Sequence, residues 1–141
     1  MKNKYEKYRE LINLAEEARK YSYSPYSSFA VGAALLSCSG EIYTGANVEN
    51  AMLGATNCAE RTAFFTAVSA GERDFEAIAV VGGKNGEPLE DFCPPCGTCR
   101  QVMAEFCDEN FKVVLMGKNN ETKILTLSEL LPFSFGKDNL K

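Results

Sequence analysis

Histidine is absent from the 141-residue sequence. Its absence excludes the Ser-His-Asp triad, the Cys-His dyad and every zinc site that uses an imidazole ligand. A metal ion would therefore need cysteine, aspartate or glutamate ligands. Proton transfer would need a carboxylate, lysine, tyrosine or cysteine side chain.

Long apolar runs and an excess of basic residues are also missing. No window reaches the length that spans a bilayer, and the N-terminus is a charged amphipathic stretch rather than a signal peptide. The 15 Lys plus Arg and 19 Asp plus Glu give a net charge of −4, which lacks the basic footprint of a general duplex binder. We expect a cytoplasmic protein with a small-molecule substrate and neither nucleic acid nor membrane as partner.

The length predicts a single domain over residues 1–141, with a frayed tail after about residue 137. Hydrophobic periodicity and turn signals predict the elements. These are helices over 3–20, 57–70 and 95–107, strands over 29–37, 41–48, 76–81, 111–116 and 122–127, and a short turn capped by Ser128. This order predicts the α/β class, with a mixed five-stranded sheet in a three-layer α/β/α arrangement and helices on both faces.

Six cysteines are more than average but fewer than a disulfide scaffold carries. In a reducing compartment, clustered thiols more often bind metal or act in catalysis than form disulfides. Cys96 and Cys99 form a C-x-x-C unit at a predicted helix start, where unpaired N–H groups favour the thiolate. Taken alone, this unit leaves a metal site, a redox dithiol and packed thiols about equally open.

Cys58 favours the metal site. It lies in the first turn of another predicted helix, and helix starts gather at one edge of an α/β sheet. Three thiolates with one open position are typical of a catalytic zinc, whereas a fourth protein ligand closes a structural one. Cys93 is the rival fourth ligand, because a C-x-x-C-x-x-C run extends from 93 to 99. The same spacing echoes part of an iron–sulfur run, an alternative that would leave Cys58 unexplained. We interpret the two remaining cysteines as packed thiols: Cys38 and Cys107.

Two charged residues follow Cys58. Glu60 could complete a capping box with Asn57, or it could move protons beside metal-bound water. Arg61 could be a solvated helix residue. It could also offset charge, because Zn²⁺ with three thiolates sums to −1.

Several segments together resemble the cytidine deaminase family, in its small homotetrameric three-cysteine zinc type. The specific part is Cys58-Ala59-Glu60-Arg61-Thr62-Ala63, followed by Pro95-Cys96-Gly97-Thr98-Cys99-Arg100-Gln101. The resemblance extends over nearly the whole chain. Its other segments are Phe29-Ala30-Val31-Gly32-Ala33-Ala34, Asn47-Val48-Glu49-Asn50-Ala51 and Leu130-Leu131-Pro132-Phe133-Ser134-Phe135.

The resemblance implies one Zn²⁺ per subunit, held by Cys58, Cys96 and Cys99, with Arg61 balancing the charge. It implies hydrolytic deamination of cytidine and 2′-deoxycytidine to uridine or deoxyuridine plus ammonia, within pyrimidine salvage. Zinc activates the attacking water in this class of enzyme, and Glu60 would be the catalytic acid/base.

The resemblance also implies the substrate contacts. Asn47 and Glu49 would hold the ribose, and the Ala59 backbone N–H would bind the base. Phe29 would lie against the pyrimidine, and Phe135 would reach the site of a neighbouring subunit in a homotetramer. Without the resemblance, both phenylalanines would be interpreted as core residues.

The chain departs from the family pattern at two positions. Leu53 stands where many relatives carry tyrosine, and Pro94, preceded by Cys93, stands where serine is usual. Two other functions remain as alternatives. The segment Asn47–Asn50 favours a nucleoside sugar over a blasticidin-type substrate, and a zinc-stabilised binding module would have no need of Glu60.

Overall fold

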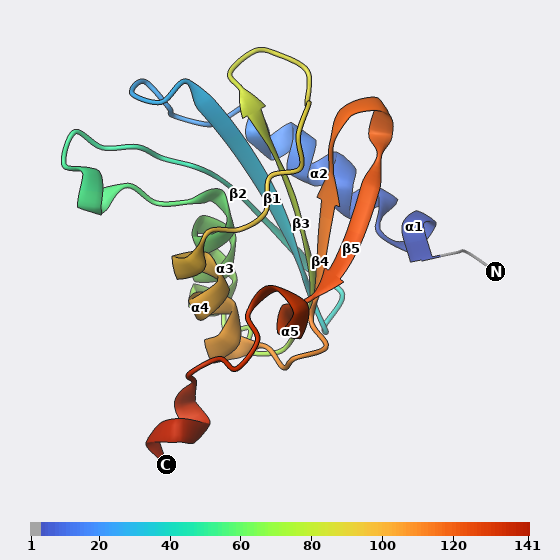
Figure 1. Ribbon diagram of the computed structural model, residues 1–141, viewed down its shortest axis with the longest axis vertical. Coiled ribbons are helices and arrows are strands. Elements are labelled where there is room, and N and C mark those ends of the chain that lie inside the picture. The colour runs from blue at the N-terminus through green and yellow to red at the C-terminus, as the bar shows by residue number, and fades with distance from the viewer. Residues whose placement is uncertain (1–3) are drawn as a thin grey trace.

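The computed structural model describes residues 4–141 (Figure 1). Residue 3, where the first helix is predicted to start, lies outside this range. None of the helices in the described range is long and apolar enough to cross a bilayer.

One five-stranded sheet organises the chain, in the order β2-β1-β3-β4-β5. β3 and β4 are parallel, and the other neighbouring pairs are antiparallel. The predicted mixed five-stranded sheet is therefore confirmed. The strands are β1 (Phe29–Ser37), β2 (Ile42–Ala46), β3 (Phe75–Lys84), β4 (Lys112–Met116) and β5 (Thr122–Thr126).

Helices cover both faces of the sheet, as predicted (Figure 1). On one face lies α2 (Arg9–Arg19), preceded by the short α1 (Lys4–Lys7). On the other lie α3 (Ala59–Ser69) and α4 (Gly97–Phe106), and α5 (Leu127–Leu130) follows β5. Short 3₁₀ turns complete the chain: η1 (Leu53–Ala55), η2 (Lys118–Asn120) and η3 (Lys137–Leu140).

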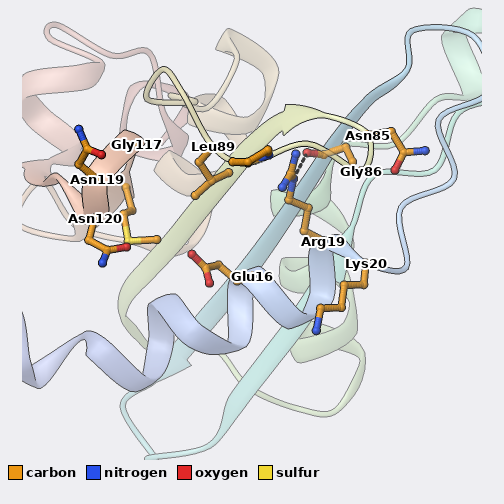
Figure 2. A pocket seen from close by; sticks show the side chains of 12 residues that line it. Glu16, Arg19, Lys20, Asn85, Gly86, Leu89, Gly117, Asn119 and Asn120 are labelled. Carbon is orange, nitrogen blue, oxygen red and sulfur yellow. Dashed lines mark hydrogen bonds between the residues drawn. The ribbon is translucent and has the colours of Figure 1, made fainter.

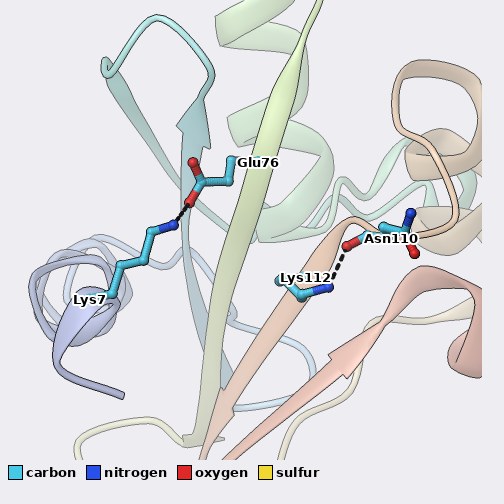
Figure 3. Close-up of polar contacts among 4 residues, drawn as sticks. All are labelled: Lys7, Glu76, Asn110 and Lys112. Carbon is cyan, nitrogen blue, oxygen red and sulfur yellow. Dashed lines mark hydrogen bonds and ion pairs between the residues drawn. The ribbon is translucent and has the colours of Figure 1, made fainter. Parts of the chain in front are cut away.

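The α2 face of the sheet is packed with aliphatic side chains. Leu11 and Ala15 of α2 are buried against alanines and valines of the strands. A Cβ atom on Gly32 would overlap the carbonyl oxygen of Ala15, so this glycine lets helix and strand backbones touch. An ion pair of 2.7 Å from Lys7 to Glu76 ties the end of α1 to β3, and Lys112 Nζ donates to the Asn110 carbonyl at the start of β4 (Figure 3).

The opposite face carries an aromatic core and the two helices that begin with cysteine-containing turns. Phe64 of α3 is fully buried, and its ring centroid lies 5.2 Å from that of Phe75. A Cβ atom on Gly45 of β2 would lie 2.6 Å from the Ala59 carbonyl oxygen. This close contact places the first turn of α3 directly over β2.

Two predicted boundaries were wrong. The helix over 3–20 is divided at Tyr8, whose backbone is not helical. The Gly82-Gly83 pair does not end β3, because both residues pair with β1 and the strand continues to Lys84. Residues Lys137–Leu140 form an exposed 3₁₀ turn, and the frayed tail after about residue 137 stays a prediction.

The predicted cap of the last short helix was also wrong. Thr126 caps α5, not Ser128, since the Thr126 hydroxyl accepts from the Glu129 amide and the Glu129 carboxylate accepts from the Thr126 amide. This reciprocal pair is a capping box.

Candidate metal centre

Two helix starts bring three thiols together. Cys58 is the N-cap of α3 and Cys96 the N-cap of α4, both with extended backbone, and Cys99 is the third residue of α4. The three Sγ atoms all lie within 4.8 Å of one another. The predicted meeting of Cys58 with the C-x-x-C unit is therefore present in the structure.

The spacing of the thiols fits a zinc ion. Zn–S bonds of about 2.3 Å at tetrahedral angles place two sulfurs roughly 3.8 Å apart. The Cys58 and Cys96 Sγ atoms are 3.8 Å apart, and those of Cys96 and Cys99 are 3.5 Å apart. An ion can thus be held without moving the backbone of either helix start.

The other three cysteines lie elsewhere. Cys93 packs against β3, and a Cβ atom on Gly82 would lie 2.7 Å from its Sγ. Burial also raises the pKa of Cys93 to about 12. Cys38 in the β1–β2 hairpin and Cys107 after α4 border a separate cavity beside the C-terminal segment. Among residues 4–141, one group of cysteine, aspartate or glutamate side chains lies close enough together to hold a metal ion. It consists of Cys58, Cys96 and Cys99, and it does not include Cys38, Cys93 or Cys107.

Arg61 provides the positive charge that the thiolates require. Its Nη2 donates to Cys58 Sγ over 3.2 Å. The pKa of Cys58 falls to about 5, because Cys99 donates a hydrogen bond to it and the Arg61 guanidinium stabilises the thiolate. The pKa of Cys99 is raised, because this thiol keeps the shared proton. These contacts favour the thiolate form of Cys58, which is the form that binds metal.

Glu60 lies beside the thiols and out of water. Only 4% of its surface is exposed. Burial raises the pKa of Glu60 to about 7, and the negative charge of Cys58 adds to this effect. A carboxyl group with a pKa near neutrality can both accept and return a proton at physiological pH.

The predicted capping box between Asn57 and Glu60 does not form. Asn57 precedes the cap, and its Nδ2 donates to Thr62 Oγ1 over 3.0 Å. Its backbone pairs with Val48 in an isolated bridge, which holds it outside the helix. Cys58 takes the capping position without a capping hydrogen bond. The Glu60 carboxylate instead accepts from its own backbone amide and from the Cys99 thiol.

The side chains expected to hold a ribose are fixed by the protein itself. Asn47 is buried; its Oδ1 accepts from Ser22 Oγ and the Val31 amide, and its Nδ2 donates to the Phe29 carbonyl. One amide hydrogen of Asn47 is left over. The Glu49 carboxylate accepts from the Tyr26 and Ser27 amides and the Ser27 hydroxyl.

These contacts favour the ionised form of Glu49. Its pKa is lowered, mainly by the Ser27 hydroxyl. A carboxylate offers about four acceptor positions, so one remains for a ligand hydroxyl. The sequence reasoning missed the supporting role of Ser22 and Ser27. The signal available was the serine-rich loop that directly precedes β1.

The remaining predicted contacts lie at different depths. Ala59 is buried at the first position of α3, where a helix leaves its N–H groups unpaired. Phe29 is 41% exposed at the start of β1, with its ring beside Gly82 and Cys93. Phe135 is 60% exposed in the C-terminal segment, away from the core of its own chain.

A cavity of about 590 Å³ lies on the other side of the sheet, beside α2 (Figure 2). Arg19 borders it and donates to the carbonyls of Lys84 and Glu87. It contains none of the cysteines and none of the predicted substrate contacts. The metal centre and this cavity are therefore separate features.

Similarity to known proteins agrees with this centre. Residues 5–116 match the family described as "Cytidine and deoxycytidylate deaminase zinc-binding region". The chain belongs to this deaminase family. It is 51% identical over 130 residues to a cytidine deaminase of Halalkalibacterium halodurans, covering 92% of this chain and 95% of that protein. It is 49% identical to one of Sporosarcina psychrophila, covering 92% of each.

A solved structure agrees at the level of the fold. The crystal structure of cytidine deaminase from Burkholderia pseudomallei superimposes with a TM-score of 0.82 at 45% identity. The match covers 89% of this chain and 97% of that one. The deaminase family and its zinc-binding character, both expected from the sequence motifs, are confirmed.

Proposed function

We propose that the protein is a single-domain, zinc-dependent deaminase that hydrolyses cytidine and 2′-deoxycytidine in pyrimidine salvage. Cys58, Cys96 and Cys99 hold one zinc, and Glu60 is the catalytic acid/base. The observation that carries this proposal is the buried carboxyl of Glu60 beside three thiols at zinc-binding distances. When bound, zinc supplies a water of lowered pKa for attack on the ring.

Glu60 moves the protons of the reaction. Deamination requires one proton to reach N3 of the pyrimidine and one to reach the departing amino group. A single carboxyl group with a pKa near 7 can take and return both protons. Its burial keeps bulk water from competing for them.

The sugar contacts use the hydrogen-bonding positions that the protein leaves free. Glu49 accepts from a ribose hydroxyl at its remaining position, and Asn47 donates its remaining amide hydrogen. Both side chains are held by the loop and strand around them, so they lose little freedom when the nucleoside binds. The Ala59 N–H and the Phe29 ring contact the base.

The exposed C-terminal segment supports a homotetramer with shared active sites. Phe133 is fully exposed and Phe135 is largely exposed. In Figure 1 the end of the chain extends away from the sheet. Burying two phenylalanine rings at about 25 cal/mol per Å² offsets the ordering of a short segment. Phe135 closes the pocket of a neighbouring subunit over the base.

The direct experiment follows cytidine loss by absorbance, with metal content measured on the same sample. We expect about one zinc per chain and loss of turnover with a strong chelator. Cys96→Ser should lose zinc, and Cys93→Ser, the matched control, should keep both zinc and activity. Cytosine should be a much poorer substrate than cytidine. Zinc coordinated by four sulfurs without turnover would instead indicate a closed structural site.

A mixing experiment tests the shared site. Inactive Glu60→Gln subunits are combined with active subunits that lack Phe135. Hybrids should regain substrate affinity, because the tail and the acid/base come from different chains. If hybrids form but bind substrate no better than the subunits that lack Phe135, the shared active site is contradicted.

The expected cytoplasmic location stays a prediction, which cell fractionation tests.

A further inference from the structure

The segment that delivers Cys96 to the metal centre has little structure of its own. Residues 85–96, between β3 and α4, contain neither helix nor strand. Within residues 4–141, the carbonyls of 91–96 accept hydrogen bonds from one residue, Arg100. Its amide donates to the Cys96 carbonyl over 3.0 Å, and its Nε donates to the Pro95 carbonyl over 2.8 Å.

The same guanidinium reaches a second segment. Arg100 Nη1 donates to the Leu130 carbonyl over 2.6 Å. Leu130 is the last residue of α5, where helix carbonyls lack intrahelical donors. One half-buried arginine thus joins the peptide before a zinc ligand to the end of a different helix.

The α5 end of this link is itself well anchored. The Leu127 amide donates to the Phe111 carbonyl and the Ser128 amide to the Glu109 carbonyl. Thr126 and Glu129 add the capping box, and the Leu127 side chain is 4% exposed. Figure 1 shows α5 between α4 and the end of β5. Arg100 therefore connects Pro95 to the sheet through a rigid support.

We infer that Arg100 is a positioning residue for the metal centre, which holds Cys96 at its ligating distance by joining Pro95 to Leu130. A guanidinium presents several N–H donors in one rigid plane, so it can bridge two carbonyls at fixed separation. A lysine ammonium carries the same charge but lacks this fork. The positioning role of Arg100 therefore depends on the geometry of its guanidinium, and a positive charge alone would not fulfil this role.

The neighbouring residue provides a matched control. Gln101 also contacts the C-terminal segment, since its Nε2 donates to the Phe135 carbonyl over 2.8 Å. It makes no hydrogen bond to the ligand segment in the described chain. Arg73 is a second control, because its guanidinium also binds backbone carbonyls, those of Val68 and Glu72, at the far end of α3.

The experiment measures zinc release from the loaded protein into a coloured chelator. Partners that orient metal ligands typically change metal affinity about 10- to 100-fold. We expect Arg100→Lys and Arg100→Gln each to speed zinc release by about tenfold or more. Gln101→Ala and Arg73→Lys should release zinc at the wild-type rate. Circular dichroism confirms that each variant is folded.

A distant variant tests the link from its other end. Thr126→Ala removes the cap of α5 and touches neither α4 nor the thiols. It should speed zinc release roughly threefold, as the loss of a capping hydrogen bond allows. In Arg100→Lys, where the bridge is broken, adding Thr126→Ala should have no further effect. This non-additivity would not follow from general loss of stability.

The outcomes separate this inference from the zinc assignment on which it rests. If Arg100→Lys released zinc at the wild-type rate, the inference would be overturned. If in addition Arg100→Gln released zinc faster, the effect of Arg100 would be one of charge and not of geometry. Fully additive effects of Arg100→Lys and Thr126→Ala would also overturn the inference. Failure of the zinc assignment has a different signature: wild-type protein without zinc, or Cys96→Ser that retains it.

Discussion

Two glutamates occupy the first turn of two helices and behave in opposite ways. Glu60 of α3 is buried, and its pKa is raised to about 7. Glu129 of α5 is exposed, and its pKa is lowered, chiefly because its carboxylate accepts from the Thr126 backbone amide. Both feel a helix N-terminus, which favours an anion by about 0.3–1 kcal/mol. Burial can raise a carboxyl pKa by about 3–5 units, so at Glu60 it outweighs the helix.

The caps differ in the same way. α5 begins with Thr126, whose hydroxyl accepts a backbone hydrogen bond. α3 and α4 begin with Cys58 and Cys96, which make no capping hydrogen bonds. Thiols are weak acceptors, so these two helix starts give up the stabilisation that serine or threonine would provide. The two helix starts at the candidate site present thiols, whereas the start of α5 carries a stabilising cap.

The largest expected effect comes from exchanging Glu60 for its amide. Glu60→Gln keeps the size but cannot move protons, and loss of a general acid/base costs about 10²–10⁴ in rate. We expect kcat to fall at the upper end of this range, because one residue serves several transfers, with zinc content unchanged. The matched change Glu129→Gln should leave kcat at the wild-type value. Near-normal turnover by Glu60→Gln would remove the distinction between the two glutamates.

The sequence predicted that Cys58 would meet the Cys96–Cys99 unit, because both lie at predicted helix starts, and the structure brings these three thiols together. The catalytic role of Glu60 stays a prediction. The sequence misplaced the caps, because Asn57 and Cys58 are adjacent and both precede the same helix. The bridge between Asn57 and Val48, which closes the loop between them, holds Asn57 outside the helix, so Cys58 is the N-cap of α3. Gly82 and Gly83 looked like a strand end, but pairing with β1 outweighs their local preference. Neither effect is visible in a local window.

Removing zinc should separate the helix starts. Metal at about 100 times its dissociation constant contributes roughly 2.7 kcal/mol to the free energy of unfolding. We expect at least this loss on chelation, with a lower Tm. Hydrogen exchange should accelerate strongly in the first turns of α3 and α4 and much less in α5. Uniform acceleration across all three would show that the capping difference has no energetic meaning.

A smaller effect should follow from giving α4 a good cap. In the metal-free protein, Cys96→Ser places a hydroxyl where the Cys99 amide can donate to it. We expect the free energy of unfolding to rise by about 1 kcal/mol relative to metal-free wild type. Cys38→Ser, at an exposed thiol outside any N-cap, should change it little. With zinc present the order should reverse, because the serine variant loses a ligand. A lower Tm for metal-free Cys96→Ser would contradict this.

The smallest effect concerns acid. The pKa of Glu129 is lower in the folded chain than its ordinary value of 4.5. Its contribution to stability is therefore complete above pH 4.5 and is lost as pH falls through the folded-state value. The Thr126 amide, which donates to Glu129 Oε1 over 2.9 Å, reports this directly. Its NMR chemical shift should titrate with a midpoint below 4.5, and Glu129→Gln should abolish the titration. A midpoint at or above 4.5 would mean that the capping box does not favour the carboxylate, and the contrast with Glu60 would then rest on burial alone.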